Sequence, residues 1–569
     1  MQVYKAPLKD YKFLIKDFLN SGSTDLLFKN SGIDQSDLEM ILDEAAKLCE
    51  EILLPINQSA DTEGCTFNKG KVTTPKGFKE AYKNFVANGW QGITVDKKYG
   101  GQNLPYFMNI FLDEMISSSN MSFSLYPVLT SNAIEAIEKS ASDEIKKLYL
   151  PKLSTGEWTG TMNLTEPHCG TDLGLSKTKA QPQEDGSYKI TGTKIFITCG
   201  EHDMSENIIH LVLAKTPNSP EGIKGISLFV VPKIIPNADG TLGEYNLLEC
   251  GSIEKKMGIN ASPTCVMHYN EAKGWLVGDL HKGMQAMFIM MNGARLMVGV
   301  QGLGIAEISY QSALHYAKER LQGRSLGGAK FPDKPADPII VHPEIRKNLL
   351  KIKTLTEGLR GLMVWTGLQV DISKIEKDKF KKQTANDWVS LMTPILKSFS
   401  TDVGCEAANL ALQIYGGHGY IKDHGIEQLV RDSRITPIYE GTNGLHATNL
   451  AKNLSRSNGQ DAARAFEKDI ELAASNVLPD TKSALIETIN LWCQSRDTIA
   501  QMADPGMIAY DFMKMSGLLA FGSAWGRLEK TAEYAPNPDK ISQLSGFVWE
   551  YMLPETGLLF ERIKRYSTL

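Results

Sequence analysis

The sequence has no cysteine pattern that would define a disulfide framework or a metal site. Its eight cysteines lie far apart, with neither a CxxC motif nor a Cys/His spacing typical of metal ligands. We therefore expect free thiols in a reducing compartment, no metal ion and a cytoplasmic protein. The cysteines are Cys49, Cys65, Cys169, Cys199, Cys250, Cys265, Cys405 and Cys493.

Long apolar runs and an excess of one charge are also missing. The start of the chain has no apolar signal core. No run of about 18 uncharged apolar residues occurs, so we expect no membrane span. The formal net charge is −5, which gives no reason to expect a nucleic acid or another polyanion as a partner.

The apolar pattern changes along the 569 residues, which exceed the usual size of one domain. Helical spacing occurs at 9–20 and 33–54, where Asp34 or Ser36 is a candidate cap. β-rich stretches at 188–197, 208–214 and 226–231 predict a small β-domain rather than βαβ units. We predict four segments: a helical domain at 1–160, a β-domain at 161–276, a helical bundle at 277–457 and a helical extension at 458–569.

Two features of the third segment have both a structural and a functional interpretation. Residues 299–304 hint at a dinucleotide fingerprint, but no strand precedes them, so close helix packing is favoured. A run of methionines is interpreted mainly as core packing, because methionine fills irregular apolar gaps. These methionines are Met284, Met287, Met290, Met291 and Met297.

The most informative segment is Arg-Ile-Thr-Pro-Ile-Tyr-Glu-Gly-Thr-Asn at 434–443. Proline before Glu440 and glycine after it interrupt any helix. Glu440 is the only carboxylate in this mostly apolar turn, so desolvation should raise its pKa toward the range useful to a general base. Taken alone, it is also compatible with an ordinary loop glutamate.

Together with three other segments, this turn resembles the acyl-CoA dehydrogenase family. The catalytic glutamate of that family occurs in a Tyr-Glu-Gly-Thr turn, and Glu440 occupies the matching position. Thr-Glu-Pro-His-Cys-Gly-Thr-Asp at 165–172 resembles the flavin-and-substrate loop, and Gly-Thr-Lys-Ile-Phe-Ile-Thr at 192–198 resembles the strand beside the isoalloxazine ring. Gln-Ile-Tyr-Gly-Gly-His-Gly-Tyr at 413–420 resembles the turn that meets a partner subunit's flavin. The motifs occur in the family's order across most of residues 40–455.

The resemblance implies a mainly α fold with a small β-domain: a helical N-domain, a middle β-domain and a four-helix-bundle C-domain, here with a C-terminal helical extension. It also implies FAD as the cofactor. Arg320 matches an arginine near the FAD pyrophosphate, and Thr442 and Asn443 should lie near its phosphates or adenosine. The other implied cofactor contacts are Met162, Leu164, Thr165, Gly170, Thr171, Phe196, Thr198, Gln413, Gly416 and Gly417.

The implied substrate is an acyl-CoA thioester, contacted by Thr171, Gly441, Asn292 and Arg295. Asn292 stands where the family often has aspartate, so its contact with the CoA arm differs from the common one. α,β-Dehydrogenation needs a base for the α-proton, here Glu440, and a cofactor as hydride acceptor, because no side chain accepts hydride. Donors to the thioester oxygen would be the backbone N–H of Glu440 and a ribityl hydroxyl, as in the family.

Departures from the common pattern indicate a branch of the family. His168 and Cys169 replace a frequent Gly-Ala pair, and a helical extension follows residue 455. Together with the opening Tyr-Lys-Ala-Pro-Leu at 4–8, these features resemble the 3-methylmercaptopropionyl-CoA dehydrogenase branch, which acts in dimethylsulfoniopropionate degradation. A general short-, medium- or long-chain acyl-CoA dehydrogenase of fatty acid metabolism is the alternative.

Two further alternatives concern partners and electron acceptors. A DNA-associated flavoprotein of the adaptive-response type would have a basic extension, but acidic residues outnumber basic ones by 15 to 11 in residues 458–569. An oxidase would pass electrons to oxygen, which sequence does not exclude. We expect an electron-transfer flavoprotein as the acceptor. We also expect a homodimer, because the turn at 413–417 should complete the partner's site.

Overall fold

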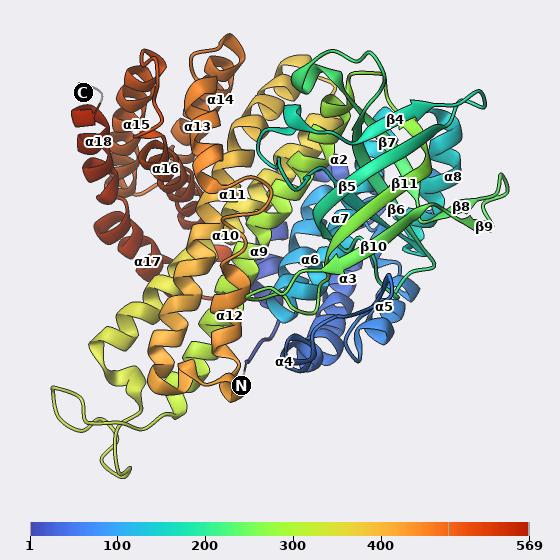
Figure 1. The fold of residues 1–569 in the computed structure, drawn as a ribbon. Helices are drawn as coiled ribbons and strands as arrows, with labels where there is room; N and C mark the ends of the chain where they lie inside the picture. Colours follow the sequence, from blue (N-terminus) through green and yellow to red (C-terminus); the bar gives the residue numbers. More distant parts are fainter. Residues whose placement is uncertain (1, 476, 567–569) are drawn as a thin grey trace. The chain divides into compact units, whose positions relative to one another are not determined.

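The computed structural model describes residues 2–475 and 477–566 (Figure 1). The chain divides into two compact units. The first contains Met1–Glu50, Pro105–Ser119 and Arg295–Leu569, and the second contains Glu51–Leu104 and Asn120–Ala294. The predicted fold class is confirmed: the protein is mainly helical, with a β-sheet domain and a C-terminal helical extension.

The regular secondary structure of the first unit, among its described residues, is helical. Asp34 caps α3 and accepts hydrogen bonds from the backbone N–H groups of Ser36 and Asp37, so one of the two expected caps is confirmed. The helices are α1 Leu8–Phe13, α2 Gly22–Ser31, α3 Gln35–Lys47, α6 Tyr106–Ser119, α10 Pro343–Ile375, α11 Lys379–Tyr415, α12 Ile426–Ser433, α13 Asn443–Asn453, α14 Ser457–Ala473, α15 Pro479–Ala500, α16 Ala509–Lys530, α17 Pro538–Phe547 and α18 Glu555–Tyr566. The part of α9 (Gly283–Glu319) from Arg295 onward also belongs to this unit.

Glycines bring α9 against its neighbours in the first unit. A Cβ on Gly302 would lie 2.2 Å from the Ser400 carbonyl oxygen of α11, and one on Gly304 would lie 2.7 Å from the Ser117 side chain of α6. Both distances are shorter than van der Waals contact, so only glycine permits this approach. The glycine run at 299–304 is therefore a packing motif inside a helix, which confirms the structural interpretation.

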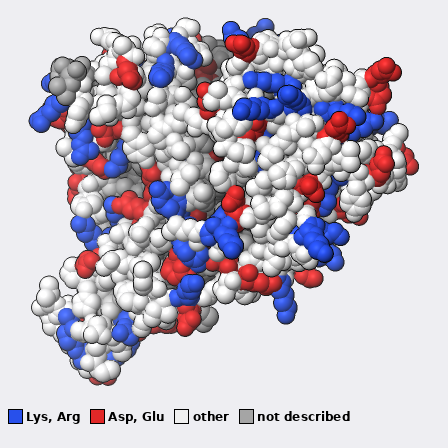
Figure 2. Space-filling model, in the orientation of Figure 1, with Lys and Arg blue, Asp and Glu red and all other residues white. Residues whose placement is uncertain are grey.

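The extension packs on the bundle helices within the first unit. In Figure 1, α14–α18 lie beside α10 and α11, and both signs of charge are interspersed on their visible face in Figure 2. Most residues of α16 are buried. A cavity of about 430 Å³ remains between α10, α11 and the extension, with Asp402 and Tyr510 among its lining residues.

The second unit is built on a seven-stranded sheet. The strand order is β10-β11-β5-β4-β6-β3, and β7 pairs with β11 and β6. Most pairs are antiparallel, which agrees with the predicted absence of βαβ units, although β6 pairs in parallel with β3 and β4. The strands of this sheet are β3 Trp158–Asn163, β4 Lys179–Pro182, β5 Tyr188–Thr198, β6 Asn207–Lys215, β7 Ile226–Pro232, β10 Leu248–Ile253 and β11 Thr264–Val277. The helices are α4 Leu54–Glu63, α5 Phe78–Ala87, α7 Met121–Ser140 and α8 Asp143–Thr155, and β8 Ile234–Pro236 pairs with β9 Leu242–Tyr245.

Alternate residues of the central strands enter two different apolar clusters. In β6, Leu211 and Leu213 face the cluster that includes α7 and α8, whereas Val212 faces a second cluster on the other side of the sheet. This follows from the two-residue period of a strand. Met287 and Met290 of α9 are fully buried in the first cluster, so the interpretation of these methionines as core residues is confirmed.

Two details of the second unit differ from the predicted helical segment that ends near 160. A hairpin, β1 Thr66–Asn68 and β2 Lys71–Thr73, interrupts the helices, because Lys69 and Gly70 both adopt positive φ and close a tight turn. Strand β3 also begins at Trp158, slightly earlier than expected.

The cysteines and the long apolar helix α9 bear on two further predictions. All eight cysteines are free thiols, as predicted. No membrane span was expected, yet α9 is long and apolar enough to cross a membrane by length and composition. However, 67% of its most apolar stretch is buried inside the protein, as in a core helix.

Candidate active site

Glu440 lies in a strained turn between α12 and α13. Its φ is +55°, and Gly441 follows with φ +86°. A left-handed conformation is uncommon for a residue with a Cβ and persists only where its surroundings enforce it. Thr442 then caps α13 by accepting a hydrogen bond from the Leu445 N–H. Such strain in an irregular segment is typical of functional sites.

Neighbouring helices hold this turn through two of its carbonyl groups and through the Tyr439 hydroxyl. His446 of α13 donates from Nε2 to the Glu440 carbonyl oxygen at 2.9 Å. Lys397 of α11 donates from Nζ to the Gly441 carbonyl oxygen at 2.7 Å. The Tyr439 hydroxyl donates to Gln301 of α9. The unfavourable φ of Glu440 is therefore maintained by three different helices.

The half-buried carboxylate of Glu440 has the electrostatic properties of a base. Burial raises the pKa of Glu440 to about 7, and the cations Arg295 and Lys397 limit this rise. A carboxylate with this pKa is ionised in part near neutral pH and accepts a proton more readily than an ordinary glutamate. The predicted direction of the shift is thus confirmed. The sequence did not reveal Lys397, although a lone lysine among apolar and hydroxyl residues of α11 was an available signal.

In the second unit, the residues that match the flavin motifs gather at β3 and β5. The Ile195 N–H donates to the Thr165 carbonyl at 2.9 Å, and the Thr161 hydroxyl donates to the Thr198 carbonyl at 2.7 Å. Phe196 has φ +57° where the β5–β11 register shifts, and its side chain is 59% exposed. A bulge of this kind re-aims a side chain away from the sheet. The remaining motif positions here, which are half-buried or exposed, are Met162, Leu164, Gly170 and Thr171.

A buried ion pair fixes the loop that carries Thr165. Lys194 Nζ lies 2.9 Å from Glu166 Oε1, and both side chains are almost fully buried. Glu166 also accepts hydrogen bonds from Ser176, from the Lys177 N–H and from the hydroxyl and N–H of Thr178. Burial alone would raise the pKa of Glu166, but Lys194 and these donors lower it to about 2. Glu166 and Lys194 belong to the sequence segments 165–172 and 192–198. The separation of these segments along the chain did not predict that the two side chains would pair.

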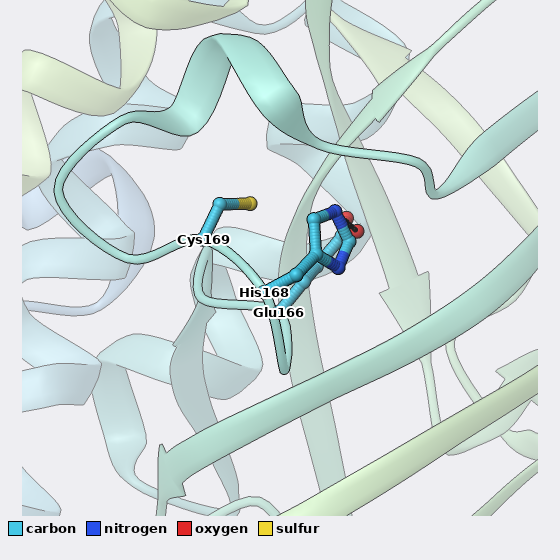
Figure 3. A group of neighbouring side chains, drawn as sticks. All are labelled: Glu166, His168 and Cys169. Atoms are coloured by element: carbon cyan, nitrogen blue, oxygen red, sulfur yellow. Dashed lines mark ion pairs between the residues drawn. The ribbon is translucent and has the colours of Figure 1, made fainter.

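Glu166, His168 and Cys169 also form the group with metal-ligating atoms shown in Figure 3, all within 4.8 Å of one another. The carboxylate of Glu166 is already neutralised by Lys194 and hydrogen-bonded on both oxygens. His168 Nε2 is 2.9 Å from the Leu175 carbonyl oxygen and therefore acts as a donor. These partners leave the group suited to fixing the loop rather than to binding a cation.

The other predicted site residues lie in several places. Asn292, on the α9 segment of the second unit, is exposed; Arg295, on the α9 segment of the first, is half-buried beside Glu440. Arg320 is exposed just after α9. Asn443 is 4% exposed, and its amide is hydrogen-bonded to Lys397, Ser398, Thr401 and Asp402. Its side chain is committed to the protein interior, so we do not assign it to the cofactor.

The turn after α11 is open. Gln413, Gly416 and Gly417 are exposed, and a Cβ on either glycine would meet nothing within 4 Å. Gly416 has φ +59° with ψ −139°, a conformation that essentially requires glycine. Tyr420 and Ile421 beside it are exposed large apolar residues.

Three models of one protein family match the chain. They are the N-terminal domain of acyl-CoA dehydrogenase at residues 35–157, the middle domain at 161–272 and the C-terminal domain at 281–455. The chain belongs to the acyl-CoA dehydrogenase family. It is an oxidoreductase, as predicted, and the family's cofactor is FAD.

Relatives of this acyl-CoA dehydrogenase include extended members. It is 44% identical to 3-methylmercaptopropionyl-CoA dehydrogenase of Ruegeria pomeroyi over 82% of this chain and 78% of that protein, which confirms the predicted branch resemblance. It is 34% identical to a butyryl-CoA dehydrogenase of Syntrophomonas wolfei over 93% of this chain and 91% of that one. A Bacillus anthracis acyl-CoA dehydrogenase complexed with FAD has the same fold, with a TM-score of 0.75, 21% identity and coverage of 94% and 88%.

The residues of this acyl-CoA dehydrogenase fit FAD. The segments at β3 and β5 combine exposed or half-buried apolar side chains with the hydroxyl groups of Thr165, Thr171 and Thr198, a combination suited to the faces and polar edge of a flavin ring. The space around Gly416 and Gly417 is open, and because neither residue has a side chain, the backbone of this turn is accessible to a ligand.

Proposed function

We propose that the protein catalyses the α,β-dehydrogenation of a short acyl-CoA thioester, with 3-methylmercaptopropionyl-CoA as its substrate. The observation that carries this proposal is Glu440, a carboxylate fixed in a left-handed turn with its pKa raised to about 7. The names of the two relatives described above, both dehydrogenases of short acyl-CoAs, support the substrate class. A broader acyl-CoA specificity is the alternative, since the chain is also 32% identical to the broad-specificity enzyme FadE5 of Mycobacterium tuberculosis.

In the proposed reaction, Glu440 removes the α-proton of the thioester, and its backbone N–H donates to the thioester oxygen as enolate charge develops. Lys397 and Arg295 keep part of the Glu440 population ionised and thus ready to accept the proton. FAD, when bound, supplies the acceptor for the β-hydride. Thr165, Thr171, Phe196 and Thr198 are the residues that would hold the flavin ring.

The function is tested by mixing the FAD-loaded protein with an acyl-CoA panel without oxygen. Loss of flavin absorbance with short acyl-CoAs would support dehydrogenation, and no bleaching with any of them would contradict it. Air is then admitted. Slow re-oxidation that an electron-transfer flavoprotein accelerates would support the proposed acceptor, whereas rapid re-oxidation by air would show an oxidase.

For substrate choice, we expect kcat/KM to be highest for butanoyl-CoA and methylthiopropanoyl-CoA among four thioesters that also include octanoyl- and palmitoyl-CoA. In a deep pocket, each buried CH₂ would contribute about 0.8 kcal/mol of favourable binding free energy, which corresponds to about a fourfold rise in kcat/KM. The methionines of α9 add no support for this preference, because Met287 and Met290 are buried in the core. A maximum at octanoyl-CoA or beyond would show the broader specificity to be right.

For assembly, we propose a homodimer in which the turn at 413–417 completes the partner's FAD site. The exposed glycines and the neighbouring Tyr420 and Ile421 support this role. Light scattering should report two chains for the FAD-loaded protein, and Gly416→Val should lose FAD while each chain keeps its helical content. An active, FAD-loaded monomer would contradict the proposal.

A further inference from the structure

Lys397 is a buried lysine beneath the Glu440 turn. It comes from the middle of α11, has no exposed surface, and donates to the Gly441 carbonyl at 2.7 Å and to Asn443 Oδ1 at 2.9 Å. These two acceptors belong to residues one and three positions after Glu440. The ammonium group therefore binds the turn at the point where it would otherwise relax from its strained conformation.

The same contacts continue into the C-terminal extension. Asn443 Nδ2 donates to Asp402 Oδ1 at 3.0 Å, and the Tyr510 hydroxyl donates to Asp402 Oδ2 at 2.5 Å. Tyr510 stands on α16, more than 100 residues from Asp402 in sequence. Asp402 thus links the extension to the turn through one amide side chain.

Charged groups on three elements face Glu440 or its lysine neighbour. Arg295 from α9 and Lys397 from α11 both favour the ionised form of Glu440. Asp402 from α11 in turn favours the charged form of Lys397, against the burial that lowers the pKa of that lysine to about 7. The imidazole of His446 from α13 is kept neutral, because burial and then Arg295 lower its pKa to about 4.

We infer that Lys397 is the positioning residue of the Glu440 turn, and that the extension completes this support through Tyr510 and Asp402. The inference rests on the proposed role of Glu440 as the base. It gives the extension a function at the site. Without the Tyr510 hydroxyl, Asn443 is the one side-chain hydrogen-bond donor to Asp402 among the described residues, so the carboxylate that stabilises charged Lys397 is held less firmly. The extension then acts on the reaction without touching substrate.

The test is the pH dependence of flavin bleaching by butanoyl-CoA in single turnovers of the FAD-loaded enzyme. Lys397→Met removes a cation that favours ionised Glu440, so the pKa of Glu440 rises and the half-maximal rate moves to higher pH by about one unit. Asp402→Asn and Tyr510→Phe should shift it upward by less. Tyr551→Phe is the matched control, because Tyr551 lines the same cavity but its ring lies under Lys347, 4.7 Å from the ammonium group.

Hydrogen exchange gives a second readout that does not depend on turnover. Backbone amides of residues 438–446 should exchange faster in Tyr510→Phe than in the wild type, and Tyr551→Phe should leave them unchanged. If Lys397→Met does not fold, Asp402→Asn and Tyr510→Phe still provide the test, since they leave Lys397 and its two contacts with the turn in place.

Unshifted pH profiles in Lys397→Met, Asp402→Asn and Tyr510→Phe, the three network variants, would overturn the inference. A rate lowered equally at every pH would also overturn it. Glu440→Gln, measured alongside, separates this failure from that of the proposed function. If Glu440→Gln is inactive but the pH profiles of the network variants are unshifted, only the inference about Lys397 and the extension is refuted. Bleaching by Glu440→Gln at the wild-type rate refutes the base itself.

Discussion

Replacing Glu440 by glutamine is expected to lower the rate of dehydrogenation by about 10²–10⁴-fold, the usual contribution of a general base. The amide has nearly the same shape, so the turn, the fold and FAD binding should persist, but it cannot accept the α-proton. The measurement is stopped-flow flavin bleaching by butanoyl-CoA. Glu344→Gln, an exposed carboxylate in the first turn of α10, is the control and should behave as wild type.

The wild-type rate should also rise with pH through about 7, because the carboxylate must be ionised to act and burial holds its pKa near this value. The glutamine variant should lose this limb of the profile together with its activity. A variant that bleaches at a near-native rate with the same pH dependence would show that another group is the base.

The second large effect concerns stability. Lys194→Met should destabilise the second unit by about 3–5 kcal/mol, because it leaves the buried carboxylate of Glu166 without its counter-ion. The double variant Glu166→Gln with Lys194→Met should recover part of this loss, since no buried charge then remains unpaired. Thermal unfolding measures the loss, and hydrogen exchange of residues 165–178 locates it. Lys189→Met, which breaks the exposed pair with Glu271, is the control and should cost less than about 1 kcal/mol.

The same pair predicts a pH dependence of stability. The pKa of Glu166 is lowered from its ordinary value of 4.5 to about 2 in the folded protein. Its contribution is therefore fully present above about 4.5 and is lost as the pH falls toward 2. The Lys194→Met variant should show a weaker loss of stability over this interval. Equal acid sensitivity in both proteins would contradict this role of the pair.

What the sequence predicted well were local features. The helix caps, the interruption at Glu440 and the β-rich stretches depend on neighbouring residues, so their pattern is readable along the chain. Lys397 and Tyr510 were not found, because their importance comes from contacts between helices remote in sequence. Asn443 was matched to the cofactor by motif alone, whereas in the folded chain α11 surrounds its amide.

The cavity beside Asp402 and Tyr510 offers a route to selective inhibition. Its volume of about 430 Å³ lies within the size range of small-molecule sites, about 300–1,000 Å³. On the role proposed above for Tyr510, a compound that occupied this cavity and displaced the Tyr510 hydroxyl from Asp402 is expected to slow flavin reduction. The family's C-terminal domain model ends at residue 455, before α16, so family members that stop there have no counterpart of Tyr510. Such a compound would distinguish enzymes with the extension from their shorter relatives.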